Sequence, residues 1–85
     1  TKMDFTLDYG SIQKPYIYSP ATIKIHNNKD SRTYIIIKDM SGNVITRVQP
    51  DNDYEYEFTE NTGYPTYFTM STEGLTSGNI SIANP

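Results

Sequence analysis

The feature that most constrains this chain is the alternation of apolar and polar residues in short segments that are separated by turn-forming residues. In the clearest segment, residues 54–59, three aromatic residues alternate with Glu55, Glu57 and Thr59. A period of two residues places the two sets of side chains on opposite faces of a β-strand. Residues 3–9 and 21–27 follow the same pattern, with Phe5 and Leu7 apolar in the first and Ile23 and Ile25 in the second. These segments therefore predict strands that are buried on one face.

A central hairpin is predicted over residues 33–48, with its turn at Ser41, Gly42 and Asn43. Residues 34–37 read Tyr-Ile-Ile-Ile, so a one-residue slip would exchange the buried and exposed sets. We expect Ile35 and Ile37 to face the core. Four consecutive apolar residues also predict burial on both sides of this strand, so we expect its outer face, with Tyr34 and Ile36, to be covered by the chain itself or by a partner.

The remaining segments complete an all-β pattern. Residues 64–71 and 79–83 read as strands, whereas residues 16–18 lie between Pro15 and Pro20 and predict an edge strand or an extended connector. Seven or eight strands at spacings of about ten residues, with no helical period, predict a sandwich or a small barrel. We favour one domain over residues 1–85, a small antiparallel β-sandwich of the jelly-roll or immunoglobulin-like type. The expected core is Phe5, Leu7, Ile23, Ile25, Ile35, Ile37, Tyr56, Phe58, Phe68, Ile80 and Ile82.

A family resemblance extends over residues 21–83. It depends on the Ser-Gly-Asn-Val turn at 41–44, the Tyr-Glu-Tyr-Glu-Phe strand at 54–58, Gly63 followed by Tyr67 and Phe68, and the last strand at 78–82. In these features the chain resembles the jelly-roll pre-peptidase C-terminal domains that are appended to bacterial secreted proteases. Immunoglobulin-like and carbohydrate-binding sandwiches have similar spacing. The resemblance implies an accessory module of an extracellular bacterial protein and assigns no site residue.

Composition excludes several classes of function. Ten acidic residues against seven basic ones give a net charge of −3. Because nucleic-acid affinity comes largely from Lys and Arg, an acidic chain without a basic stripe is not expected to bind nucleic acid. Cysteine is absent, so disulfides and thiolate metal sites are excluded. No stretch approaches the roughly 20 apolar residues of a membrane-spanning helix.

The sequence contains no recognisable catalytic motif. His26 is its only histidine, no Gly-x-Ser-x-Gly sequence occurs, and strand phase predicts that this histidine is solvated. We therefore expect a protein that is not an enzyme and has no cofactor, with calcium as the one candidate ion. Asp51 and Asp53, joined by Glu60 or by Asn27, Asn28 and Asp30 of another turn, offer oxygen ligands of the kind that calcium binds. The alternative is that these side chains bind the backbone of their own turn.

The candidate ligand-binding residues are Tyr16, Tyr18, Tyr34 and Tyr64, which the alternation does not place consistently inward. Flat aromatic rings on a sandwich can stack on sugars or anchor a protein partner, or they can simply pack at sheet edges. The sequence thus favours a noncatalytic binding or accessory module of an exported bacterial protein, at the cell surface or outside the cell, that recognises a polysaccharide or protein surface. The alternative is a structural subunit of a surface, fibre or phage particle that forms oligomers through its strand edges.

Overall fold

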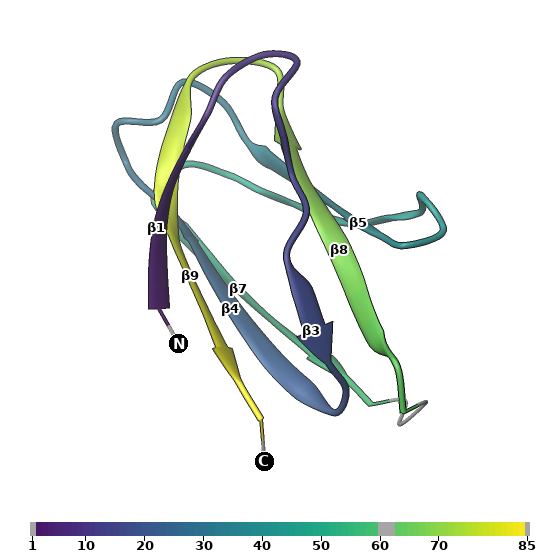
Figure 1. The fold of residues 1–85 in the computed structure, drawn as a ribbon. Coiled ribbons are helices and arrows are strands. Elements are labelled where there is room, and N and C mark those ends of the chain that lie inside the picture. Colours follow the sequence, from purple (N-terminus) through teal and green to yellow (C-terminus); the bar gives the residue numbers. More distant parts are fainter. Residues whose placement is uncertain (1, 60–62, 85) are drawn as a thin grey trace.

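The described part of the chain, residues 2–59 and 63–84 of the computed structural model, forms nine β-strands and no helix, which confirms the all-β prediction (Figure 1). The strands are β1 (Lys2–Leu7), β2 (Ile12–Gln13), β3 (Tyr16–Tyr18), β4 (Ala21–Asn27), β5 (Ile35–Asp39), β6 (Val44–Val48), β7 (Asn52–Phe58), β8 (Pro65–Thr72) and β9 (Thr76–Ala83). Residues 60–62, which belong to the loop expected between the strands at 54–59 and 64–71, lie outside the described residues.

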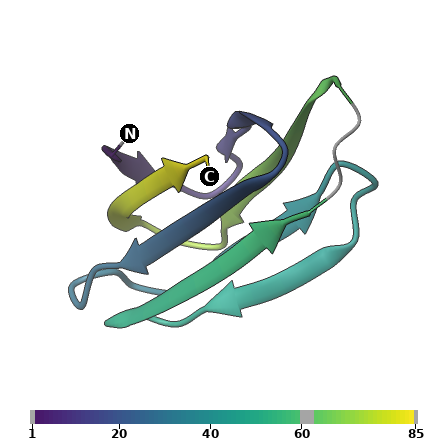
Figure 2. The ribbon, with the colours of Figure 1, turned by 90° about the horizontal axis from the view of Figure 1, so that it is seen from below.

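The strands form two antiparallel sheets that pack as a sandwich (Figure 2). The four-stranded sheet has the order β1-β9-β4-β7. The five-stranded sheet has the order β2-β8-β5-β6, and β3 also pairs with β8. The pairs are nested along the chain: β1 with β9, β2 and β3 with β8, β4 with β7, and β5 with β6. This is the jelly-roll order, so the fold is the first of the two predicted sandwich types.

The core lies between the two sheets. Of the predicted core residues, seven are fully buried, and Phe5, Tyr56, Phe58 and Ile82 pack against them at partial exposure. The sequence prediction missed four buried apolar residues: Ile17, Ala21, Val48 and Met70. Three of these four lie at or near strand ends or between prolines, where a short apolar period gives a weak signal.

The predicted facing of the central hairpin is confirmed. Ile35 and Ile37 have no exposed surface, whereas Ile36 is only partly buried. β5 is an interior strand between β8 and β6. Its outer face is not covered by any other described segment, so the described chain does not supply the cover that we expected there (Figure 2).

The backbone of the hairpin turn depends on Gly42 and Asp39. Of the two residues in this turn that tolerate a positive φ, Gly42 has one, of 87°, and Asn43 does not. The Asp39 carboxylate fixes the turn, since its Oδ1 accepts hydrogen bonds from the backbone N–H groups of Ser41 and Asn43, each at 2.9 Å. A bulge between Ile37 and Lys38 shifts the register with β6.

Several strand ends were predicted wrongly. β1 stops at Leu7, because the Asp8 carboxylate accepts a hydrogen bond from the Tyr9 N–H at 2.7 Å and starts a turn, which leaves Tyr9 77% exposed. β9 begins at Thr76, three residues before the start at residue 79 that the alternation predicted. The segment at residues 12–18 forms two short strands, β2 and β3, because Pro15 between them has no N–H to donate. The Pro15 carbonyl accepts a hydrogen bond from the Phe68 N–H at 3.3 Å.

Candidate functional site

The outer face of the five-stranded sheet collects the aromatic residues that the fold leaves exposed. On β8, Phe68 and Met70 are buried, so Tyr67, which directly precedes Phe68, points outward. On β3, Ile17 is buried, so Tyr16 and Tyr18 on either side of it point outward. We call this surface the tyrosine face. It comprises Ile12, Lys14, Tyr16, Tyr18, Tyr34, Ile36, Lys38, Val44, Arg47, Pro65 and Tyr67.

A compact aromatic cluster lies at one end of the tyrosine face. Tyr16 pairs with Tyr67 across β3 and β8, and their ring centroids are 5.5 Å apart in a tilted arrangement. The Lys14 ammonium lies 4.2 Å from the Tyr67 ring centroid and 5.7 Å from that of Tyr16. The Tyr67 hydroxyl donates to the Met40 carbonyl at 3.3 Å. These contacts restrain the rings of Tyr16 and Tyr67. Tyr16 and Tyr18 remain 60% and 67% exposed.

Tyr34 lies at the other end of the tyrosine face. Ile35 pairs with Thr72 whereas Tyr16 pairs with Tyr67, so the two tyrosines are separated by more than five residue positions along β8, about 17 Å. The Arg47 guanidinium lies 5.8 Å from the Tyr34 ring centroid, and the Tyr34 hydroxyl donates to Glu73 at 3.4 Å. Tyr34 is therefore part of a separate polar cluster.

Tyr64 borders a groove of about 510 Å³ at the end of the sandwich. The groove lies where the β5–β6 turn approaches the end of β7 and the start of β8. It is lined by Ser19, Asp39, Met40, Ser41, Tyr56, Glu57, Phe58, Thr59, Tyr64, Pro65, Thr66 and Tyr67. Tyr64 is 73% exposed, and Tyr67 belongs both to the groove and to the aromatic cluster. The groove is thus continuous with the tyrosine face.

The four predicted tyrosines consequently do not form one platform. Tyr16 and Tyr18 lie together, Tyr64 lies at the adjoining groove, and Tyr34 is remote. Sequence reasoning missed Tyr67 and Lys14 as members of the site. The alternation around Phe68 was a signal for the outward direction of Tyr67, but its contact with Tyr16 depends on the pairing of β3 with β8.

The two outer faces of the sandwich carry different charges. Among the described residues, the tyrosine face holds Lys14, Lys38 and Arg47, with the Glu73 carboxylate at its end and those of Asp39 and Glu57 in the adjoining groove. The outer face of the four-stranded sheet holds the acidic residues Asp4, Asp53, Glu55 and Glu57, with Lys2 and Lys24. The fold therefore separates an aromatic, basic surface from an acidic one, although the chain as a whole is acidic.

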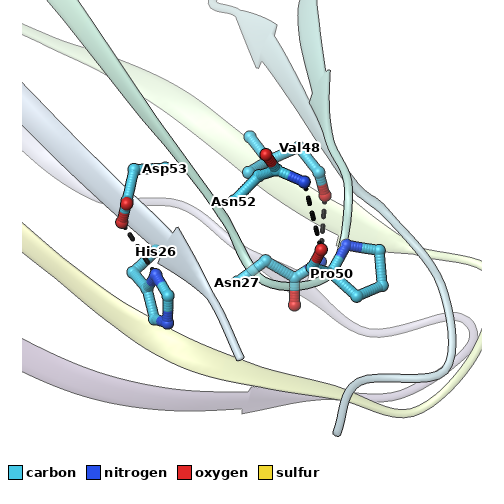
Figure 3. Close-up of polar contacts among 6 residues, drawn as sticks. All are labelled: His26, Asn27, Val48, Pro50, Asn52 and Asp53. Atoms are coloured by element: carbon cyan, nitrogen blue, oxygen red, sulfur yellow. Dashed lines mark hydrogen bonds and ion pairs between the residues drawn. The ribbon is translucent and has the colours of Figure 1, made fainter. Parts of the chain in front are cut away.

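His26 and Asp53 are paired on the acidic face (Figure 3), and Asp51 lies in the turn before β7. His26 Nδ1 donates to Asp53 Oδ1 at 2.7 Å, so this carboxylate has a partner other than a metal. Asp51 has a φ of 63°, and its backbone N–H donates to the Asn27 carbonyl at 2.8 Å. Among the described residues, no three His, Asp or Glu side chains are grouped to hold a metal ion, and Glu60 lies outside these residues. Calcium binding by Asp51 and Asp53 stays a prediction.

Asn27 is a buried polar residue near this pair, and the sequence suggested it only as a possible further calcium ligand (Figure 3). Its Nδ2 donates to the Val48 carbonyl at 2.9 Å and to the Thr33 carbonyl at 3.0 Å. Because Asn27 ends β4 and Val48 ends β6, the side chain links the two sheets. Asn27 therefore contributes to the sandwich, and it lies away from the tyrosine face.

No protein-family model matches this chain, and no curated protein matches it. The resemblance to pre-peptidase C-terminal domains therefore stays a prediction. The described residues contain no helix, and hence none that is long and apolar enough to cross a membrane. The role of the site has to be inferred from the geometry and charges of the tyrosine face.

Proposed function

We propose that the chain is a noncatalytic binding module that recognises a polysaccharide or protein surface through Tyr16, Tyr18 and Tyr67. The observation that carries this proposal is the pair of rings on β3, 60% and 67% exposed on a sheet face that no other described segment covers. Aromatic side chains that remain exposed on a rigid surface are typical anchors for ligands.

The restraint of the rings supports this role. Tyr16 is in contact with Tyr67 and Lys14, and β3 is paired with β8, so little conformational freedom remains for a ligand to remove. Restraint before binding favours affinity, because ordering side chains costs free energy. The groove beside Tyr67 and Tyr64 extends the surface that a ligand can contact.

The noncatalytic part of the proposal is supported by the position of His26. This histidine lies on the outer face of the four-stranded sheet and is hydrogen-bonded to Asp53, on the opposite side of the sandwich from the tyrosines. An imidazole is therefore not available as a general base on the tyrosine face. That the module belongs to an exported bacterial protein is supported by the resemblance of residues 21–83 to secreted accessory domains.

The proposal is tested with the double variant Tyr16→Ala/Tyr18→Ala. Retention on immobilised polysaccharides and on cell-wall material is compared with that of the unchanged protein. We expect the affinity to fall about thirtyfold or more, the effect of removing a binding hot spot, since the ligand loses both exposed rings.

Tyr9→Ala is the matched control, since Tyr9 is exposed in the turn after β1 and lies outside the tyrosine face. It should leave the affinity unchanged. Urea unfolding of both variants should resemble that of the unchanged protein, because exposed side chains contribute little to stability. Equal retention of all three proteins, or unfolding of the double variant, would contradict the role of the rings.

A further inference from the structure

Tyr67, Lys38 and Arg47 lie on a diagonal line across the five-stranded sheet, and the Lys14 ammonium lies beside the Tyr67 ring. Lys14 lies over Tyr67 on β8, Lys38 on β5 pairs with Thr69, and Arg47 on β6 pairs with Ile36, which itself pairs with Ser71. Each step from Tyr67 to Lys38 and from Lys38 to Arg47 therefore crosses one strand and advances two residues. With strand spacings of about 4.8 Å and about 3.4 Å per residue, successive positions are about 8 Å apart.

We propose that the tyrosine face binds a carboxylated polysaccharide, whose acidic groups contact Lys38 and Arg47 and whose sugar rings stack on Tyr16 and Tyr18. This proposal rests on the binding function proposed above and specifies the ligand class. Two cations at successive positions of this line, with the Lys14 ammonium beside the exposed rings, fit a polymer in which an acidic sugar repeats. The charge of the face is complementary to such a ligand.

Because the chain as a whole is acidic, an acidic polysaccharide can be attracted only locally, by the tyrosine face. With a net charge of −3, the protein as a whole repels a polyanion, and the outer face of the four-stranded sheet carries four of the ten acidic residues. Attraction must therefore come from the tyrosine face at short range, and salt should weaken it because the charges are exposed.

The experiment compares two double variants that change the net charge equally, from −3 to −5. Lys38→Gln/Arg47→Gln removes cations from the tyrosine face, and Lys2→Gln/Lys24→Gln removes cations from the acidic face. Lys24 makes an exposed ion pair with Glu55 at 3.5 Å, which contributes little to stability. The probes are polygalacturonate and alginate, with highly methyl-esterified polygalacturonate as the neutral ligand of matched backbone.

We expect Lys38→Gln/Arg47→Gln to weaken the affinity for the polyuronates about four- to twenty-five-fold, since each exposed charge pair contributes about two- to fivefold. The control variant should change it less than about twofold, and raising the salt concentration should weaken binding by the unchanged protein. Circular dichroism and urea unfolding establish that both variants remain folded.

Three results would overturn the ligand class: equal binding of the methyl ester, equal losses in the two double variants, or no binding of either polyuronate. In each case the binding function itself is judged separately by Tyr16→Ala/Tyr18→Ala. Loss of retention on a neutral glycan or on a protein in that variant would keep the binding function and exclude the acidic polysaccharide. No tyrosine-dependent retention on any probe would exclude both proposals.

Discussion

Gly78 is the residue at which the packing of the four-stranded sheet leaves no space for a side chain. It lies on β9 between Phe5 of β1 and Asn27 of β4. A Cβ atom built there would overlap the His26 carbonyl oxygen and would lie 3.0 Å from Cζ of Phe5. The Phe5 ring thus occupies the space over the glycine, so the two residues are matched in size.

Gly78→Ala should therefore destabilise the protein strongly. The backbone of β4 or β9 would have to move, and we expect a loss of about 3 kcal/mol or more in the free energy of unfolding, at the upper end of overpacking effects. Urea denaturation measures it. Ser81→Ala on the outer side of the same strand is the control and should stay within about 0.5 kcal/mol. A Gly78→Ala protein as stable as the control would show that β9 is not held against β4 as described.

At the scale of the elements, the β5–β6 turn connects the core hairpin with the tyrosine face. Asp39 holds the turn through Ser41 and Asn43, and the Met40 carbonyl within it accepts the hydrogen bond of Tyr67. The Thr66 hydroxyl also contacts the Met40 sulfur, at 3.2 Å. The turn therefore forms one wall of the groove, so its geometry affects the position of Tyr67.

Asp39→Ala should lower stability by about 1 kcal/mol, since two backbone N–H groups lose their acceptor. In a chain of this size that corresponds to a fall in melting temperature of about 4–8 °C, which thermal unfolding monitored by circular dichroism can resolve. Asp39→Asn retains a side-chain oxygen acceptor and should lose less. If the two variants melted together well below the unchanged protein, the negative charge of Asp39, and not its hydrogen bonds, would be the stabilising feature.

For the whole molecule, the open strands at the sheet edges decide between a binding module and an assembling subunit. β1 and β7 bound the four-stranded sheet, and β6 bounds the other sheet opposite β2 and β3. Edge strands offer unpaired backbone groups to another chain, but charged side chains discourage such pairing. On β7, Asp53, Glu55 and Glu57 would bring like charges together if two copies met at this edge.

We accordingly expect a monomer in sedimentation-velocity experiments across a hundredfold range of concentration. The expectation follows from the acidic residues on β7 and from the short length of β2 and β3. Assembly that increases with concentration, together with no retention on glycan or protein probes, would contradict the module and favour a structural subunit that acts through its strand edges.

Much of the molecule was open to prediction from local sequence. The alternation at residues 21–27 and 54–59 places the inward and outward side chains correctly, and the choice of Ile35 and Ile37 for the core is confirmed. The errors in the predicted strand ends occur where a local hydrogen bond or close packing has a larger effect than the alternation of apolar and polar residues. The strand ends before Tyr9 because the Asp8 carboxylate starts a turn. Gly78 lies within a strand because the Phe5 ring occupies the space that a side chain would take at this position.

The sequence by itself determined the all-β class, the inward face of most strands and the surplus of tyrosines, because these follow from a period of two residues and from composition. The tertiary structure alone decided which strands are neighbours, since pairing between residues about fifty positions apart leaves no local signal. That pairing brings Tyr16 against Tyr67 and places Lys14 over both rings. It also separates the cations of one face from the carboxylates of the other, which a linear count of charges does not reveal.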